Sequence, residues 1–123
     1  MSGKQLRGGA LLLVLLLFAA LPAAAEVMGR AEREYNTATG LFTRGDYVAA
    51  SQQADRYLHD FPADARQPDA WHLKAECLYR LYLYEEALAA YQRLAELYPQ
   101  HNLYDEALYG IGWSLMKLNR PAD

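Results

Sequence analysis

The chain has 123 residues, of which 53% are apolar, and its 12 basic and 15 acidic side chains give a net charge of −3. This length suits a single domain, the apolar content is too high for a disordered tail, and the charge balance excludes a general nucleic-acid binder. One cysteine can neither close an internal disulfide nor complete a zinc finger. Long stretches without proline or glycine favour helices over a β fold with many turns.

The first 25 residues have the pattern of a signal peptide. Lys4 and Arg7 provide a basic start, residues 10–21 are all apolar, and residues 22–25 end in the small side chains of a signal-peptidase site. The apolar run is shorter than the roughly 20 residues of a membrane-spanning helix, so we favour cleavage after Ala25 over an uncleaved anchor. After cleavage we expect a periplasmic or otherwise exported chain with no direct membrane insertion.

Residues 26–123 carry an acidic surplus. Because Lys4 and Arg7 are the only charged residues among the first 25, this remainder keeps 10 basic and 15 acidic groups. Such a balance repels nucleic acid and anionic lipid, although the charges also fit an ordinary solvated helix surface. Cys77 lies in a helical pattern, where we expect it to be a small packed side chain.

Beyond residue 26, apolar side chains recur with helical spacing, and clusters of glycine, proline and asparagine interrupt them. The expected helices are residues 30–44, 47–60, 68–81, 84–97 and 103–118. Pro68 suits a first helical turn, where its missing N–H has no partner to lose, and Asn102 is expected to cap the last helix. Glu85 and Glu86 complement the helix dipole at a helix start.

A period of 37 residues runs through this helical region. The identical pairs are Tyr47 and Tyr84, Ala50 and Ala87, Arg56 and Arg93, Pro62 and Pro99, Ala70 and Ala107, Leu78 and Leu115, and Leu81 and Leu118. They include alanines at which paired helices touch and the proline that follows each second helix. The predicted fold is therefore all-α, a solenoid of antiparallel helical hairpins that bury their faces against one another. The expected repeats are residues 31–67, 68–104 and an incomplete 105–123.

The second unit resembles the tetratricopeptide repeat family. The family's W-x2-L-G-x2-Y, A-x3-F and P pattern is represented here by Trp71, Ala75, Leu78, Ala87, Tyr91 and Pro99. Lys74 stands where the pattern has leucine, and in the first unit Glu34 stands where it has an aromatic residue. The resemblance covers about residues 31–121 and implies a right-handed solenoid of about two and a half repeats.

The spacing of 37 residues is longer than the 34 that is usual in this family. Together with the signal peptide and the repeated Phe61-Pro62 and Tyr98-Pro99, it is similar to bacterial cell-envelope members, the Tol-Pal accessory protein and the outer-membrane assembly lipoprotein. The chain departs from the lipoprotein because no cysteine stands at the expected cleavage site.

The resemblance implies a concave groove, lined by the first helix of each hairpin, that receives an extended peptide or a partner helix. Helical position places nine residues on this groove: Tyr35, Thr39, Phe42, His72, Glu76, Tyr79, Tyr109, Trp113 and Met116. Aromatic side chains suit such a surface because they bury a large area at small entropic cost, although tyrosine and tryptophan in a helical stripe more often pack between hairpins. Trp113 is the leading candidate, because residues 110–112 and Leu115 already supply the packing positions of its helix.

The sequence offers little for catalysis, so we expect no catalytic residue, no cofactor and no enzymatic activity. The three histidines are dispersed, and no serine stands in a nucleophile elbow. His72 and Glu76 lie four positions apart on one helix face, but two ligands make a poor metal site. We expect a hydrogen-bonded pair there instead.

The third hairpin lacks its second helix in this sequence. We therefore expect the natural protein to continue with further repeats, or a second molecule to cover the last helix by self-association. The favoured function is an exported, non-enzymatic scaffold of the bacterial cell envelope that binds a protein or peptide partner. The alternative is the helical part of a larger envelope enzyme, such as a peptidoglycan hydrolase, with its catalytic domain beyond residue 123.

Overall fold

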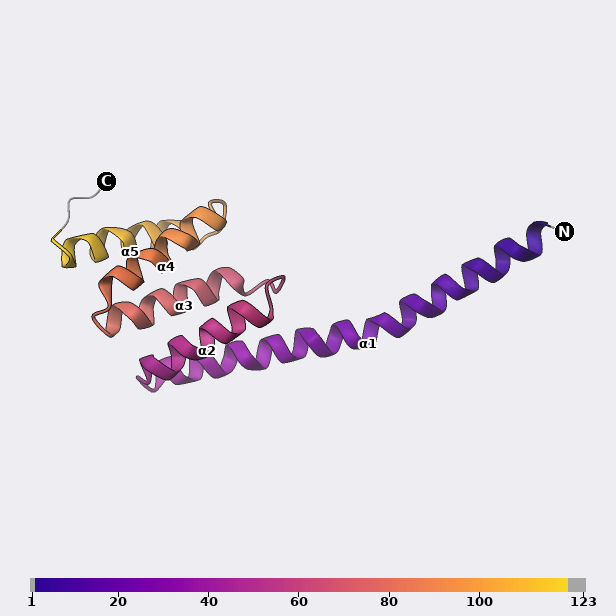
Figure 1. The fold of residues 1–123 in the computed structure, drawn as a ribbon, viewed down its shortest axis with the longest axis horizontal. Helices are drawn as coiled ribbons and strands as arrows, with labels where there is room; N and C mark the ends of the chain where they lie inside the picture. The colour runs from indigo at the N-terminus through magenta and orange to yellow at the C-terminus, as the bar shows by residue number, and fades with distance from the viewer. Residues whose placement is uncertain (1, 120–123) are drawn as a thin grey trace. The chain divides into compact units, whose positions relative to one another are not determined.

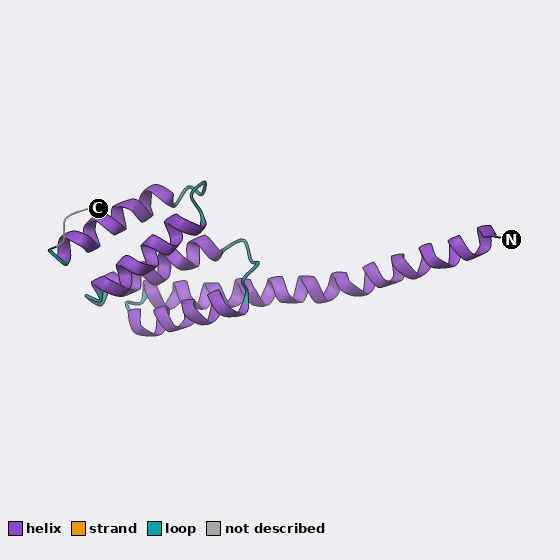
Figure 2. Cartoon of the chain, turned by 45° about the horizontal axis from the view of Figure 1, so that its top comes forward, coloured by secondary structure: helices purple, strands orange, loops and turns teal. Residues whose placement is uncertain are grey.

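The computed structural model describes the backbone of residues 2–119 and the side chains of residues 21–119. All regular structure in this backbone is helical, and no strand occurs in it (Figure 2). The helices are α1 (Ser2–Thr43), α2 (Tyr47–Asp60), α3 (Gln67–Arg80), α4 (Tyr84–Leu97) and α5 (Tyr104–Lys117). The predicted all-α fold is confirmed.

Internal contacts divide the chain into residues 1–32 and residues 33–123. The helix expected at 30–44 is wrong in its start, since α1 is continuous from Ser2. The alanines at 23–25 are good helix formers, and no proline follows them within the helix, which therefore continues through Gly29. The side chains expected to form most of the signal peptide, and the end of the third repeat at residues 120–123, lie outside the described residues.

Within the described part of the chain, no helix combines the length and the apolar character that crossing a bilayer requires.

The helices of residues 33–119 pack in chain order, α2 against α3, α3 against α4, and α4 against α5 (Figure 1). The helix α3 also contacts α5, the next helix but one. Each helix therefore meets its neighbours along the chain, which is the arrangement of a helical-repeat solenoid.

Equivalent alanines occupy equivalent surroundings in successive hairpins. Ala50 of α2 packs in a buried cluster that includes Ala38 of α1 and Cys77 of α3. At positions 37 residues further on, Ala87 of α4 packs in a buried cluster with Ala75 of α3. All four alanines are fully buried, so the paired helices approach closely, as the sequence period predicts. Cys77 is buried and not disulfide-bonded, and burial raises the pKa of its thiol to about 12.

The turn after the first helix of each hairpin repeats as well. Gly45, Tyr82 and Asn119 have φ angles of 82°, 62° and 55°, and they are spaced by the same 37 residues. A residue in this left-handed region reverses the chain at the end of a helix. The same left-handed backbone conformation thus occurs in all three turns, although only the first has glycine at that position.

Two of the predicted helix starts are confirmed and one is wrong. Pro68 lies in the first turn of α3, and the two predicted glutamates lie in the first turn of α4. Asn102 does not cap α5, because the N-cap residue is Leu103 and no side chain caps it through a hydrogen bond. The backbone amide of Leu103 instead donates to Nδ1 of His101 at 3.1 Å, which holds the turn one residue before the helix.

Candidate functional site

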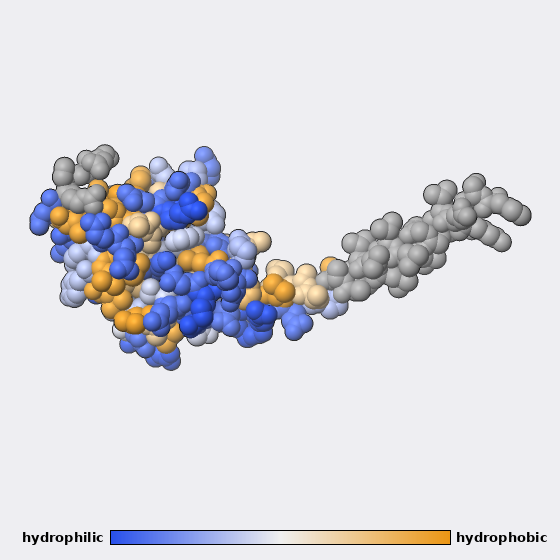
Figure 3. All heavy atoms as spheres, viewed as in Figure 1, coloured by the Kyte–Doolittle hydropathy of each residue, from blue (hydrophilic) through white to orange (hydrophobic). Residues whose placement is uncertain are grey.

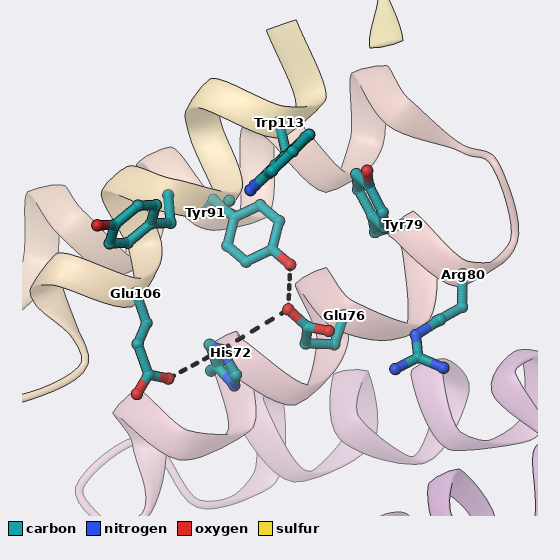
Figure 4. Close-up of a pocket in the computed structure, with 9 residues that line it drawn as sticks. His72, Glu76, Tyr79, Arg80, Tyr91, Glu106 and Trp113 are labelled. Carbon is teal, nitrogen blue, oxygen red and sulfur yellow. Dashed lines mark hydrogen bonds and ion pairs between the residues drawn. The ribbon is translucent and has the colours of Figure 1, made fainter. Parts of the chain in front are cut away.

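A cavity of about 590 Å³, which we call the α3–α5 cavity, lies between these two helices (Figure 4). It is lined by His72, Glu76, Tyr79 and Arg80 of α3, Tyr91 of α4, and Glu106, Tyr109, Gly110 and Trp113 of α5. The lining residues of α3 and α5 recur mostly every three or four positions, so each set shares one face of its helix. The solenoid packing brings these two faces together.

Tyr91 forms the floor of the cavity because α5 has a glycine opposite it. The ring is 2% exposed, and a Cβ placed on Gly110 would lie 2.4 Å from one of its carbons. The hydroxyl donates a hydrogen bond to Oε1 of Glu76 at 2.5 Å. Burial and this hydrogen bond raise the pKa of Tyr91 above its ordinary value, so the hydroxyl stays protonated and remains a donor at neutral pH.

His72 lies between two carboxylates (Figure 4). Its Nε2 is 3.8 Å from Oε1 of Glu76 and 3.4 Å from Oε2 of Glu106. The predicted contact of His72 with Glu76 is present, but it is longer than a hydrogen bond. Among the described residues, no group of three or more histidine, cysteine, aspartate or glutamate side chains is arranged to hold a metal ion.

Arg80 contributes a basic side chain to the lining, and its hydrogen bond and cation–π contacts lie on the first hairpin. Its Nη1 donates to the hydroxyl of Tyr47 at 3.3 Å. The guanidinium carbon lies 5.8 Å from the ring centroid of Phe42 and 5.7 Å from that of Tyr47, within the range of a cation–π contact. Figure 4 shows Glu106 and Arg80 at opposite sides of the cavity, with Glu76 between them.

Aromatic side chains form the rim. Tyr109 is 72% exposed and Trp113 is 53% exposed, whereas Tyr79 is half-buried and packs edge-on against Tyr84. Apolar residues also interrupt the polar surface of the helical array on the face shown in Figure 3. The cavity therefore combines a buried floor with large apolar side chains that are open to solvent.

The cavity unites five of the nine predicted groove residues, namely His72, Glu76, Tyr79, Tyr109 and Trp113. The last two also line an adjoining cavity of about 560 Å³ on α5, and Met116 lies there. Met116 is thus separated from the α3 residues of the prediction.

Two of the three predicted residues of α1 line a neighbouring space. Tyr35 and Phe42 line a smaller space of about 310 Å³, which shares three α3 residues with the α3–α5 cavity. Thr39 lines none of these three spaces, and its hydroxyl donates to the carbonyl of Asn36 at 3.0 Å. Because neighbouring spaces share their lining, they form one trough across the first helices of the hairpins, which we call the groove.

The sequence prediction did not include four lining residues, namely Arg80, Tyr91, Glu106 and Gly110. The sequence predicts Gly110 as a packing position of its helix and Tyr91 only as part of the repeat pattern, whereas the structure shows that both residues pack against each other and line the cavity. The sequence period could have indicated Glu106. It lies 37 residues after Asp69, and Asp69 lines the equivalent space beside α1.

Comparison with known families supports this architecture. Residues 68–101, which include all of α4 and all but the first residue of α3, match the tetratricopeptide repeat. A search of curated proteins gave no match. The chain therefore contains a tetratricopeptide repeat at residues 68–101, and the two helices of this repeat supply one wall and the floor of the α3–α5 cavity.

Proposed function

We propose that the protein is a non-enzymatic interaction scaffold whose groove binds an extended peptide or a helix of a partner protein. The observation that carries this proposal is the exposure of Trp113 and Tyr109 beside the α3–α5 cavity. Its volume of about 590 Å³ is within the range of ligand-binding pockets. Tetratricopeptide repeats commonly bind protein partners, which supports the same conclusion.

The two sides of the groove divide the work of binding. Trp113 and Tyr109 leave apolar area in water, and covering it contributes about 25 cal/mol for each Å² buried. Tyr91 is buried and hydrogen-bonded, so the floor is already in place before a partner arrives. A preformed floor reduces the ordering cost of association.

A peptide selection tests this function. Random dodecapeptides displayed on phage are selected against the full chain, and the affinities of synthetic copies are measured by fluorescence anisotropy. We expect Trp113→Ala to weaken binding about tenfold or more, as for an aromatic residue at the centre of an interface.

The matched control is Val48→Ala, because Val48 is also 53% exposed but lies on α2 outside the groove lining. Circular dichroism should show that both variants keep the helical content of the unaltered chain. Peptides that bind Trp113→Ala and Tyr79→Ala as tightly as the unaltered chain would show that the groove is not the binding surface.

We further propose that the scaffold acts in the bacterial cell envelope after export. The support for this is the basic start, the apolar run and the small residues at 22–25. Expression of the full reading frame in a bacterium, followed by N-terminal sequencing of the periplasmic fraction, should find Glu26 as the first residue. Ala25→Arg should block this cleavage, whereas a product that keeps Met1 in the cytoplasm would contradict export.

A further inference from the structure

We propose that the α3–α5 cavity takes a lysine or arginine side chain of the partner peptide, with its charge against Glu76 and Glu106 and its alkyl stem along Trp113. This inference rests on the proposed function and names the residue that the groove selects. The partner segment is therefore a basic peptide.

Charge complementarity is the first argument. Glu76 and Glu106 reach the same histidine nitrogen from two different helices, so both carboxylates border one small volume. Arg80 and His72 also line the cavity, and the charge of Arg80 acts on Tyr91 at the floor, so they offset part of the negative charge. The guanidinium of Arg80 is nevertheless held by the rings of Phe42 and Tyr47 and by the hydroxyl of Tyr47, which leaves the two carboxylates as the acceptors on the open side. An acidic side chain of a partner would meet like charges in the cavity, whereas a cation would be attracted.

The second argument comes from how α3 places its own cations. The Nζ atom of Lys74 lies 5.2 Å from the ring centroid of Trp71 and 2.7 Å from Oδ1 of Asp55. This ammonium group therefore uses an indole ring and a carboxylate together. The α3–α5 cavity presents the same two features, the exposed indole of Trp113 and the carboxylates, on its open side.

The floor contributes the third argument. The hydroxyl of Tyr91 donates its hydrogen to Glu76, so this carboxylate is held in one orientation at the base of the cavity. A carboxylate accepts several hydrogen bonds, and the bond from Tyr91 occupies only part of its capacity. The remaining capacity of Glu76 can accept N–H donors of an ammonium or guanidinium group.

The probe is the random dodecapeptide library on phage, selected against the full chain. We expect lysine or arginine to be enriched at one position next to an apolar residue. In a synthetic copy of a selected peptide, replacement of that basic residue by norleucine, which has a similar length and no charge, should weaken binding about tenfold.

A double-mutant cycle assigns this loss to the carboxylates. The chain variant is Glu76→Gln with Glu106→Gln, in which the amide at position 76 can still accept the hydrogen bond of Tyr91. For this variant, the lysine and norleucine peptides should bind with nearly equal affinity. The control is Glu96→Gln, because Glu96 is exposed and pairs with Arg93 outside the cavity lining, and it should keep the tenfold preference.

The outcomes separate this inference from the function on which it rests. If binding depends on Trp113 but the selected peptides have no enriched basic residue, or if the double variant keeps the tenfold preference, the cationic pocket is wrong and the groove function stands. If peptide affinity is independent of Trp113, or if no binder is selected, both proposals are overturned.

Discussion

The α2–α3 and α4–α5 interfaces share one backbone arrangement and differ in the side chains that fill it. At the α2–α3 interface, the small residue Ala54 lies on α2 and the large residue Leu73 lies on α3, and both are buried. At the positions 37 residues later, the large residue is Tyr91 and the small one is Gly110. Large and small positions are therefore exchanged between the two helices, which preserves the packed volume.

This exchange teaches how a repeat changes its groove without changing its fold. At the α2–α3 interface, the large buried side chain is Leu73, which belongs to α3, the first helix of its hairpin. At the α4–α5 interface, the large side chain is Tyr91 of α4, the second helix of its hairpin, and it packs against Gly110 of α5. Its hydroxyl reaches Glu76 on the groove side.

The turns that lead into these interfaces make the same comparison. In both, a side chain accepts a hydrogen bond from the backbone amide two residues later, Asp64 from Arg66 at 3.0 Å and His101 from Leu103 at 3.1 Å. The first turn adds a hydrogen bond from the hydroxyl of Tyr57 to Asp64. The first turn is thus held by a charged carboxylate that accepts several hydrogen bonds, whereas the second is held by a single hydrogen bond to a histidine.

The largest effect should come from filling the space at Gly110. The Cβ of Gly110→Ala would lie within 2.5 Å of three ring carbons of buried Tyr91, so overpacking should cost about 2–3 kcal/mol of unfolding free energy. Gly112→Ala is the matched control in the same helix, since its added Cβ would meet no atom within 4 Å other than those of its chain neighbours and of the surrounding helix backbone. It should stabilise the chain by up to about 1 kcal/mol through helix propensity.

Urea unfolding of the full chain, followed by circular dichroism, measures both glycine variants. Tyr91→Leu in the Gly110→Ala background should recover part of the loss, because the smaller side chain makes room for the added methyl group. Equal stability of the two glycine variants would mean that the second interface is not filled by Tyr91.

The next effect should distinguish the two turns. Burial by itself would raise the pKa of Asp64, but hydrogen bonds from Tyr57 and from Arg66 lower it below its ordinary value. Because the folded-state pKa is lower than the unfolded one, the stabilisation by Asp64 is complete above a pH of about 4 and is lost as the pH falls through the folded-state pKa. Asp64→Asn should therefore cost about 2 kcal/mol at pH 7 and less at pH 3.

The comparison variant in the second turn is His101→Ala, which removes a single acceptor and should cost about 1 kcal/mol at pH 7. Unfolding curves at pH 3 and pH 7 for both variants make the test. If Asp64→Asn lost the same amount at both pH values, the charged network would not stabilise the first turn.

The third effect concerns the equivalent buried positions Cys77 and Ser114. Both side chains are fully buried, and the Oγ of Ser114 has no hydrogen-bond partner among the described groups. Ser114→Cys should stabilise the chain by about 1 kcal/mol, because it removes a buried unpaired hydroxyl and introduces the side chain that occupies the equivalent position 77. The reciprocal Cys77→Ser should destabilise by a similar amount in urea unfolding, and a loss of stability in Ser114→Cys would contradict the equivalence.

The repeat period predicts the fold because small residues and turns recur with it. Ala50 and Ala87 fix where helices touch, and that information is local to each residue. The cavity is less predictable, since it depends on a pair of residues on different helices. Neither Tyr91 nor Gly110 indicates a cavity alone, because Tyr91 becomes the floor beside Glu76 only through its packing against Gly110 of another helix. The predicted cap at Asn102 is wrong because the N-cap position falls one residue later, at Leu103.

The smallest effect should come from the turns at Gly45 and Tyr82. Tyr82 has a φ of 62°, a conformation that costs a residue with a side chain roughly 1–2 kcal/mol, whereas glycine adopts it without that penalty. The side chain is 78% exposed, so its replacement loses little packing beyond an edge contact with Tyr84.

Tyr82→Gly should therefore stabilise the full chain by about 0.5–1 kcal/mol, after allowance for the greater entropy of glycine in the unfolded state. Tyr82→Ala removes the same ring but keeps the left-handed strain, so it should give no stabilisation, and Gly45→Ala should destabilise the first turn by about 1 kcal/mol. Thermal and urea unfolding of the three variants measure these differences. If Tyr82→Ala stabilised the chain as much as Tyr82→Gly, the benefit would come from removing an exposed ring, and the two turns would not share a backbone requirement.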